Sequence, residues 1–459
     1  MAAFKSVNTT HPRAPASSLH GVELHDPRIR SAHIASLWDG IFCTIMIALT
    51  ETFVVAAAVS LAAPPLTIGI LGSLPMMLGT LTQLLLPRIL STHKGKRRIV
   101  MTGTGTQAFF LVICGAAGLF QADFGRYLFL FAITGYGVSG SAVSVYWASW
   151  MKSLSPQECR GRLFAWRNRV FAMVQLGCTV AAGVLTRHYT ADTAPWSFFL
   201  LVFCIAAAAR GVSTLFINRQ YEPPVLSCKE TGSRTKTEGW FHTYAIGTAL
   251  FNASAAIAGP FFGVWYLRDL SLDYLSFSLC SAATVAGTVL FLPVWGQLAD
   301  RVGNLSVMRL AACMGALIPL PYLFGEAPWQ LWVFSLYSGI CWSGFNLGNF
   351  NYLLLASGEQ ESERHIALAS AVGGVAVFCF GLLGGFLAPR LPEVLGYRLR
   401  TLFLLSMLLR VATVILFFPR FKPLVNDRLL SARELFDAIP GRRVGLGIMR
   451  NVYRSARRT

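Results

Sequence analysis

Apolar residues in this chain are gathered in twelve runs of about 20 residues, and short polar segments separate these runs. Runs of this length match what an α-helix needs to cross the hydrocarbon core of a bilayer, whereas the strands of membrane barrels alternate between apolar and polar positions. Only helices and closed barrels satisfy their backbone hydrogen bonds in lipid. The pattern therefore predicts an all-α polytopic membrane protein with twelve transmembrane helices.

The predicted helices form two groups of six on either side of a polar linker. Their ranges are 36–61, 66–90, 97–120, 127–151, 164–188 and 195–217, then 240–267, 272–298, 305–324, 329–355, 365–389 and 398–419. This layout divides the chain into a cytoplasmic N-terminal segment, a six-helix half, a linker, a second six-helix half and a basic tail. The corresponding ranges are 1–33, 34–218, 219–239, 240–419 and 420–459.

The two halves resemble each other weakly, as expected for two pseudo-symmetric repeats. Arg210 in the sixth run and Arg410 in the twelfth each precede a basic exit, at Arg219 and Arg420. Internally repeated six-helix halves are typical of secondary transporters.

Composition supports the membrane assignment, because 54% of the 459 residues are hydrophobic and only 13% are charged. Soluble domains carry about 25% charged residues, so a soluble enzyme, a disordered chain and a small disulfide scaffold are excluded. The net charge of +18 is concentrated on one face when the N-terminus is placed inside. The positive-inside rule then predicts that both termini lie on the cytoplasmic side of a plasma or bacterial inner membrane. This placement explains the basic charge, so no nucleic-acid partner is expected.

Neither metal nor cofactor chemistry is expected. The ten cysteines never approach a C-x-x-C spacing, and His93, His188, His242 and His365 stand alone at the ends of apolar runs. The sequence contains no nucleophile elbow, phosphate-binding loop or dinucleotide fingerprint. We therefore expect no enzyme activity.

One loop carries a family motif. The segment Gly296-Gln297-Leu298-Ala299-Asp300-Arg301-Val302-Gly303-Asn304 resembles the G-x-L-A-D-R-x-G-R loop of the major facilitator superfamily. With the six-plus-six layout, the resemblance covers about residues 34–419 and implies two six-helix halves and transport by alternating access. The segment from Trp150 to Pro156, followed by Arg160-Gly161-Arg162, is similar to a loop of bacterial members with unassigned substrates.

The motif also has a physical interpretation. Gly296 permits close approach of two helices, while Asp300 and Arg301 can form charged contacts at the inner face. Such a latch would stabilise one access state; a plain tight turn is the alternative. The first half has Pro87 where the Asp would stand. The fourth run lacks the Arg and the fifth the Gly-Pro pair of many proton-coupled and drug-exporting members, so the resemblance implies neither activity.

Glu51 is the most prominent charged residue within a predicted span. It lies near the middle of the first run, between Thr50 and Thr52. A carboxyl at this depth has to be protonated, paired or hydrated. We interpret it as a proton-coupling carboxylate or a counter-ion for a cationic substrate group; a structural carboxyl is the alternative.

Three further charges lie within predicted spans. Asp39 is expected near the inner face. Arg210 and Arg410 are buried charges with a packing or lipid-headgroup role, and an ion pair between Arg210 and Glu51 is the alternative.

By analogy with the family, runs one, four, seven and ten line a central cavity. The candidate lining residues are aromatic or amide side chains: Tyr136, Tyr146, Trp147, Asn252, Phe262, Trp265, Trp342, Asn346 and Asn349. Such walls favour a small amphiphilic organic solute. Helix packing is the other explanation of the aromatic residues.

The sequence thus predicts a secondary active transporter of a small organic solute, with a proton as a possible coupling ion. A second hypothesis is a transporter-fold scaffolding subunit that binds partners through its tail. Leu429, Ala432, Leu435, Phe436 and Ile439 fall on one helical stripe there, which can bind a partner protein or lie on anionic lipid.

Overall fold

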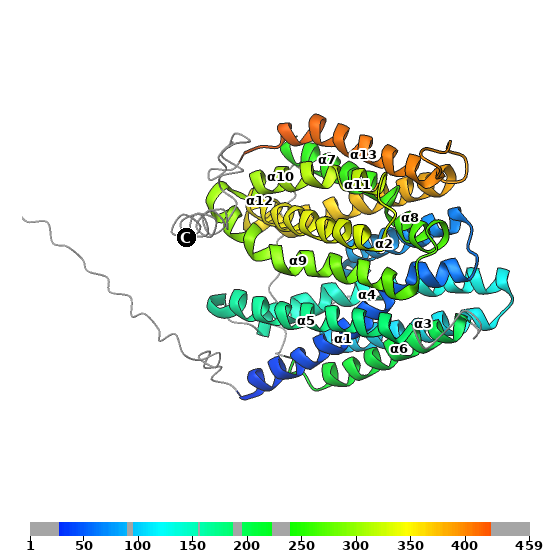
Figure 1. Ribbon diagram of the computed structural model, residues 1–459. Helices are drawn as coiled ribbons and strands as arrows, with labels where there is room; N and C mark the ends of the chain where they lie inside the picture. Colours follow the sequence, from blue (N-terminus) through cyan, green and yellow to red (C-terminus); the bar gives the residue numbers. More distant parts are fainter. Residues whose placement is uncertain (1–26, 90–94, 155–156, 187–194, 223–238, 424–459) are drawn as a thin grey trace, which may run out of the picture.

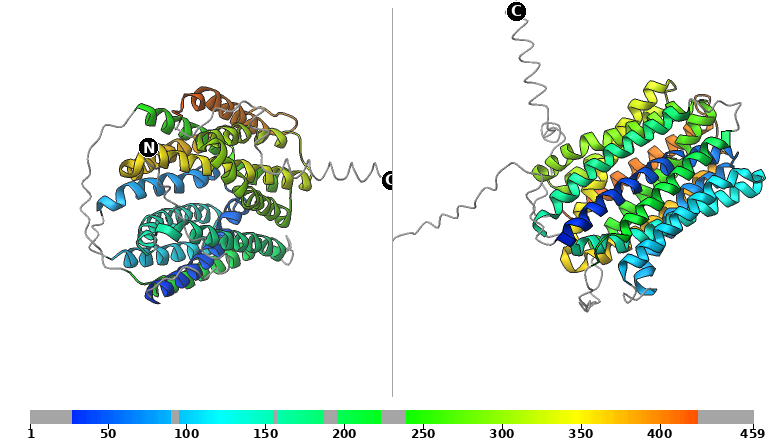
Figure 2. Two further views of the ribbon diagram at one scale, coloured as in Figure 1. Left: turned by 90° about the vertical axis from the view of Figure 1, so that its left-hand side faces the viewer. Right: turned by 90° about the horizontal axis from the view of Figure 1, so that it is seen from below.

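The structure, a computed structural model, describes residues 27–89, 95–154, 157–186, 195–222 and 239–423. These residues form a bundle of long helices that run side by side (Figures 1 and 2). The helices of the first half are α1 (Pro27–Ser60), α2 (Pro65–Ile89), α3 (Lys96–Ala116), α4 (Ala122–Leu154), α5 (Gln157–Leu185) and α6 (Pro195–Asn218). Those of the second half are α7 (Gly239–Ala256), α8 (Gly259–Val264), η3 (Trp265–Asp269), α9 (Tyr274–Val302), α10 (Asn304–Ala316), α11 (Pro319–Tyr322), α12 (Pro328–Leu387) and α13 (Arg398–Phe417).

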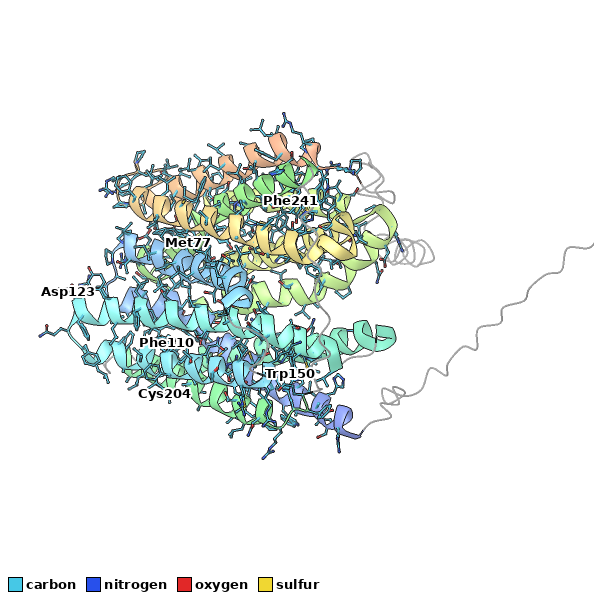
Figure 3. The ribbon with its side chains drawn as sticks, turned by 180° about the vertical axis from the view of Figure 1, so that it is seen from behind. Met77, Phe110, Asp123, Trp150, Cys204 and Phe241 are labelled. Carbon is cyan, nitrogen blue, oxygen red and sulfur yellow. The ribbon has the colours of Figure 1, made fainter. Side chains whose placement is uncertain are left out.

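The bundle has two ends. We call the end where α1 begins the terminal end, and the end where α1 finishes and α2 begins the distal end. Figure 3 shows the alternation for α4, whose first-turn residue Asp123 lies at the distal end and whose Trp150 lies toward the terminal end.

Helix α12 crosses the bundle twice although it is helical over 60 residues. Near its start, Trp332 donates a hydrogen bond to the Ser276 carbonyl at the distal end of α9. Near its finish, Gly385 lies against Leu66 at the distal end of α2. Between them, His365 stacks on Phe241 in the first turn of α7 at the terminal end. The helix therefore travels to the terminal end and returns, so it contains two spans.

Eleven helical segments of the described chain are long and apolar enough to cross a membrane. The remaining predicted span, 329–355, is the first arm of α12 and is more polar. The predicted fold class, an all-α polytopic membrane protein, is confirmed. Helices α1 and α5 begin several residues before the predicted spans, because a helix continues into water beyond the apolar stretch that hydropathy detects. The predicted boundaries of the N-terminal segment, linker and tail fall largely outside the described residues.

Two spans predicted as continuous are broken. The seventh stops at Ala256 and resumes as α8 at Gly259, and the ninth stops at Ala316 and resumes as α11 at Pro319. Pro260 and Pro319 lack the N–H that an unbroken helix would use, which explains both positions. Broken helices at membrane depth are tolerated where they border a cavity or other protein.

Close glycine contacts between the halves lie toward the distal end and, where Gly374 meets Thr80, reach the middle of the bundle. Gly69 of α2 lies against Gly381 of α12, Val55 of α1 packs against Gly263 of α8, and Gly183 of α5 lies against Ser278 of α9. We call these three contacts the distal seal. No hydrogen bond or ion pair between described residues joins the halves at the terminal end.

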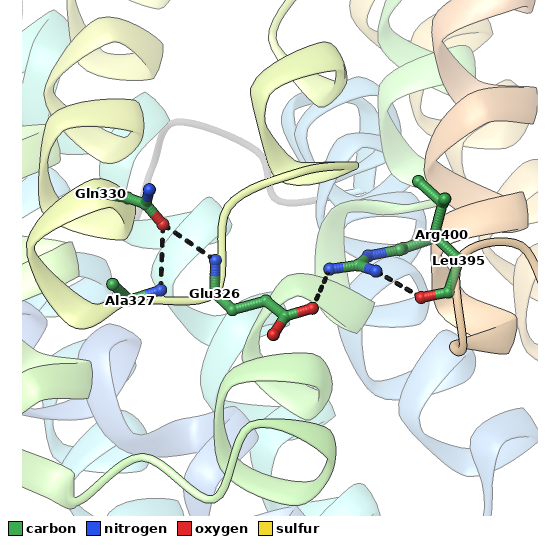
Figure 4. Close-up of polar contacts among 5 residues, drawn as sticks. All are labelled: Glu326, Ala327, Gln330, Leu395 and Arg400. Carbon is green, nitrogen blue, oxygen red and sulfur yellow. Dashed lines mark hydrogen bonds and ion pairs between the residues drawn. The ribbon is translucent and has the colours of Figure 1, made fainter.

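The distal end of the second half has its own polar contacts (Figure 4). Arg400 forms an ion pair of 2.6 Å with Glu326 and donates to the Leu395 carbonyl. The Gln330 Oε1 accepts the backbone N–H groups of Glu326 and Ala327, both at 3.0 Å. These bonds fix the turn that enters α12.

Glycines allow α9 and α12 to touch through their backbones, which predicts a strong position dependence of substitutions. A Cβ added at Gly339 would lie 2.0 Å from the Thr284 carbonyl oxygen, whereas one at Gly373, on the same helix, would meet nothing within 4 Å. We expect Gly339→Ala to destabilise the fold by about 3 kcal/mol. The matched Gly373→Ala should stabilise it by about 0.5–1 kcal/mol. Thermal unfolding of the purified chain measures both; equal melting temperatures would contradict this packing.

Candidate functional site

A cavity of about 430 Å³ lies between α2 and the helices of the second half. Both helix breaks border it, at Ala256, Gly259 and Ile318. Its remaining lining residues are Gly72, Met76, Asn252, Ala255, Pro260, Phe262, Ser338, Trp342, Val377 and Arg410. Its volume falls within the range of small-molecule sites, roughly 300–1,000 Å³.

A smaller cavity of about 170 Å³ adjoins the first and shares Phe262, Ile318 and Ser338 with it. Tyr266 and Tyr322 also border it. On the other side of Phe262, the Phe403 ring stacks at 4.3 Å. The two cavities thus share an aromatic wall that packing holds in place.

Three of the predicted lining residues border the larger cavity, namely Asn252, Phe262 and Trp342. Asn252 donates to the Thr248 carbonyl at 2.8 Å, so its amide is oriented by its own helix.

The other predicted lining residues have different surroundings. Tyr146 is buried at the terminal end, Trp147 lies 4.4 Å from the Arg167 guanidinium, and Trp265 is fully buried in the core. Asn346 is exposed, while Asn349 accepts a hydrogen bond of 2.7 Å from Tyr244. Tyr136 packs against the main hydrophobic core. The structure does not bring these six residues to the cavity.

Glu51 faces the interface between the halves, one helical turn from Val55 of the distal seal. Residues four apart share a helix face, and Val55 points at Gly263 of the second half. Glu51 is exposed although Thr50 and Thr52 beside it are buried. It forms no hydrogen bond or ion pair with a described residue, and Tyr136 lies within its electrostatic range. The Glu51 side chain is therefore exposed one turn from the seal, although the surrounding protein partly desolvates its carboxyl.

Arg210 belongs to a buried polar network in the first half. It donates to the Gln107 Oε1 through Nε at 2.8 Å and Nη2 at 2.5 Å, and to the Ser213 hydroxyl at 2.9 Å. Ser213 in turn donates to Asp39 at 2.7 Å. Arg210 and Asp39 are 4% exposed. The counter-charge of Arg210 is thus Asp39 and not Glu51, and Asp39 lies inside the bundle.

Arg410 has a different environment. It is 2% exposed, borders the larger cavity, and donates from Nη1 to the Gly315 carbonyl at 3.0 Å. Its Nε is sealed from solvent without a hydrogen-bond partner among the described residues. Cys341 is the one ionisable group that interacts with it electrostatically in the described chain.

The family motif forms the junction of α9 and α10. Gly303 has φ 88° and ψ 158°, a backbone conformation that favours glycine, and separates the two helices. A Cβ at Gly296 would meet no atom within 4 Å, so this glycine makes no close helix contact here. Asp300 and Arg301 are exposed, and Asp300 forms no bond with a described residue. The predicted latch contact is not formed in this arrangement.

Sequence reasoning missed the contribution of α2 and the second arm of α12 to the cavity. Gly72, Met76 and Val377 are ordinary residues of apolar helices and carry no separate signal. The Gly259-Pro260 pair was a usable signal, because it marks a break where backbone can border a ligand. Among the described residues, no group of three or more metal-ligating side chains is present.

The fold is that of a multi-pass helical membrane protein with a cavity beside the interface of two helical halves. The model of the Major Facilitator Superfamily matches residues 244–450. A bacterial homologue of the iron transporter ferroportin in an inward-facing state superposes with a TM-score of 0.67 at 15% identity, over 87% of this chain and all of that one. The nucleoside transporter NupG gives 0.63 at 13% identity, over 87% of this chain and all of that one.

Among curated proteins, a homologue of the multi-drug resistance efflux pump PmrA from Lactococcus lactis is 26% identical over 230 residues, 47% of this chain and 54% of that protein. Multidrug resistance protein MdtG from Proteus mirabilis is 27% identical over 216 residues, 45% and 50% of the two chains. The chain spans about half the length of the curated relatives it matches. The resemblance to the major facilitator superfamily is confirmed, by the family model over the second half and by the fold over most of the chain.

Proposed function

We propose that this protein is a secondary active transporter that moves a small amphiphilic organic solute by alternating access. The observation that carries the proposal is a cavity beside the interface of two helical halves, whose close glycine contacts lie toward the distal end and the middle of the bundle. A chain in this arrangement exposes a central site to one side at a time when the halves rock against each other. The names of the curated relatives, efflux and multidrug resistance proteins, support an organic solute.

The arrangement corresponds to an inward-facing state if the terminal end is cytoplasmic. The distal seal then closes the outer side, and the carboxyl of Glu51 lies open to the inner side. We further propose that Asp300 and Arg301 form their latch contact in the opposite state, where the terminal ends of the halves approach each other. The tail helix that motivates the scaffolding hypothesis lies outside the described residues.

Topology can be tested with cysteine accessibility. We expect cysteines introduced at residue 229 and in the tail to react with an impermeant reagent from the same side as the N-terminus. The distribution of Lys and Arg predicts that all three lie on the inner face. Labelling of residue 229 from outside, with residue 1 labelled from inside, would overturn the twelve-span orientation.

Transport itself is tested in proteoliposomes with three naphthalene probes of similar shape. Two of them are charged and impermeant, and one is neutral. These are 2-naphthalenesulfonate, 2-naphthalenesulfonamide and 2-naphthyltrimethylammonium, with ethidium as a drug-like cation. We expect protein-dependent counterflow of at least one charged probe. If none exchanges in either orientation, although the chain reconstitutes and is folded, the transport proposal is wrong.

A further inference from the structure

The cavity contains one buried cation that the fold does not neutralise. Arg410 is 2% exposed and borders the cavity, and among the described residues its guanidinium donates a hydrogen bond through Nη1 alone. Nε has no partner, and no described residue accepts a bond from Nη2. A guanidinium presents five N–H donors in a fixed fork, so most of its donor capacity remains unused.

Arg210, the counterpart of Arg410 in the first half, is an arginine whose hydrogen bonds are made within the protein. Arg210 places its donors on Gln107 and Ser213, and Asp39 supplies the negative charge. Arg410 occupies the equivalent run of the second half and has no acidic neighbour in the described chain. Within the described chain, an acidic residue therefore compensates the positive charge of Arg210 but not that of Arg410, although the two arginines occupy matching sequence positions.

The two helix breaks explain how a guanidinium without an acidic partner among the described residues is tolerated beside the cavity. Helices α7 and α10 both end there, and the C-terminus of a helix carries a partial negative charge. Gly315, whose carbonyl accepts the Arg410 bond, lies in the last turn of α10. These partial charges offset a full positive charge only in part.

We propose that Arg410 binds the anionic group of the transported solute, which makes the substrate an amphiphilic organic anion such as an aromatic sulfonate, phosphate ester or carboxylate. This inference rests on the proposed function. A buried guanidinium beside a largely apolar cavity is the group that proteins use for planar oxyanions.

The remaining walls fit the apolar body of such a solute. Met76, Phe262, Trp342 and Val377 supply apolar and aromatic surface. Ser338 adds a hydroxyl that can bond to polar atoms of the ligand. An aromatic ring beside Trp342 with its anionic group at Arg410 would use both kinds of surface.

Ligand-dependent thermal stabilisation of the full purified chain tests the proposal without requiring transport. We expect 2-naphthalenesulfonate to raise the melting temperature by roughly 3 °C or more at saturation. The neutral sulfonamide and the trimethylammonium analogue should have little effect. Equal stabilisation by the cation, or none by the anion, would overturn the proposal.

Arg410→Met supplies the variant, because methionine fills similar space without the charge. Its melting temperature without ligand should equal or exceed that of the wild type, and the response to the sulfonate should disappear. Arg398→Gln, at an exposed arginine of the same helix, is the matched control and should keep the response. A sulfonate response that survives in Arg410→Met assigns the anion to another site and ends the proposal.

A second measurement does not need the Arg410 variant to fold. The test compares the reaction rates of an anionic and a trimethylammonium methanethiosulfonate with Ser338→Cys, each corrected for its rate with the parent chain. The anionic reagent should react about tenfold faster, because the guanidinium raises the local anion concentration. The sulfonate should protect the cysteine. Faster reaction of the cation contradicts the inference. If the sulfonate protects the cysteine and stabilises the protein but shows no counterflow, the anion site is supported and the transport proposal is wrong.

Discussion

Glu51→Gln is expected to abolish gradient-driven accumulation of the transported solute while exchange continues. One coupled proton moving down one pH unit releases about 1.4 kcal/mol, a factor of about ten. A gradient of two pH units can therefore drive at most roughly 100-fold accumulation per proton, and the variant should accumulate nothing. The carboxyl is exposed one turn below the distal seal and has no cationic partner in the described chain, so it is free to exchange a proton.

The measurement compares two assays in the same proteoliposomes. Uptake of the probe that shows counterflow is recorded with and without an imposed pH gradient, and counterflow is recorded without one. Glu393→Gln is the matched control, because Glu393 is an exposed carboxyl paired with Arg398 at the distal surface. It should behave as the wild type. Wild-type accumulation with unchanged pH dependence in Glu51→Gln would assign the residue a structural role.

Gly385→Val is expected to prevent closure of the distal end. A Cβ at Gly385 would lie 2.9 Å from both the Leu66 Cα and the Pro65 oxygen, which are backbone atoms of the other half and cannot rotate away. A contact of this kind is relieved by separating the halves. An overpacking penalty of about 1–3 kcal/mol in the closed arrangement would shift the access equilibrium by roughly 5- to 150-fold.

A cysteine at Val55 reports on this shift, since Val55 packs against Gly263 in the distal seal. Labelling from the distal side by an impermeant reagent should accelerate about tenfold or more in Gly385→Val. Gly373→Val is the control on the same helix, because its Cβ meets no atom within 4 Å. Identical labelling rates in the two variants would show that Gly385 does not contribute to closure.

The helices could be predicted from sequence because their signal is continuous and local. Apolar length alone placed the spans, with ends that differ where a helix continues into water, as α1 does from Pro27. The hydropathy pattern did not reveal the breaks at Ala256 and Ala316, because it does not change when a helix bends. A proline follows each break a few residues later. The return of α12 depends on contacts with α2 and α7, which no local pattern contains.

The sequence could indicate which residue types can line a cavity, but not which of them would border it. Asn252, Phe262 and Trp342 border the cavity as expected, but Trp265 has the same chemistry and lies in the core. Which face of an apolar helix meets the cavity is decided by packing against neighbours. The different surroundings of Arg210 and Arg410 likewise arise from Asp39 on α1, far away in sequence.

The distal seal consists of glycine, serine and valine contacts and holds no ion pair between described residues of the two halves. Dispersion contacts are insensitive to dissolved ions, whereas exposed charge pairs weaken as ionic strength rises. The three contacts of the distal seal should therefore be equally strong in dilute and concentrated buffer. Among the described residues, the charged link between the halves at this end is a hydrogen bond of 3.4 Å from Arg268 to the Ala63 carbonyl. A large effect of salt on the balance between the two access states would then originate at the opposite, charged end of the bundle.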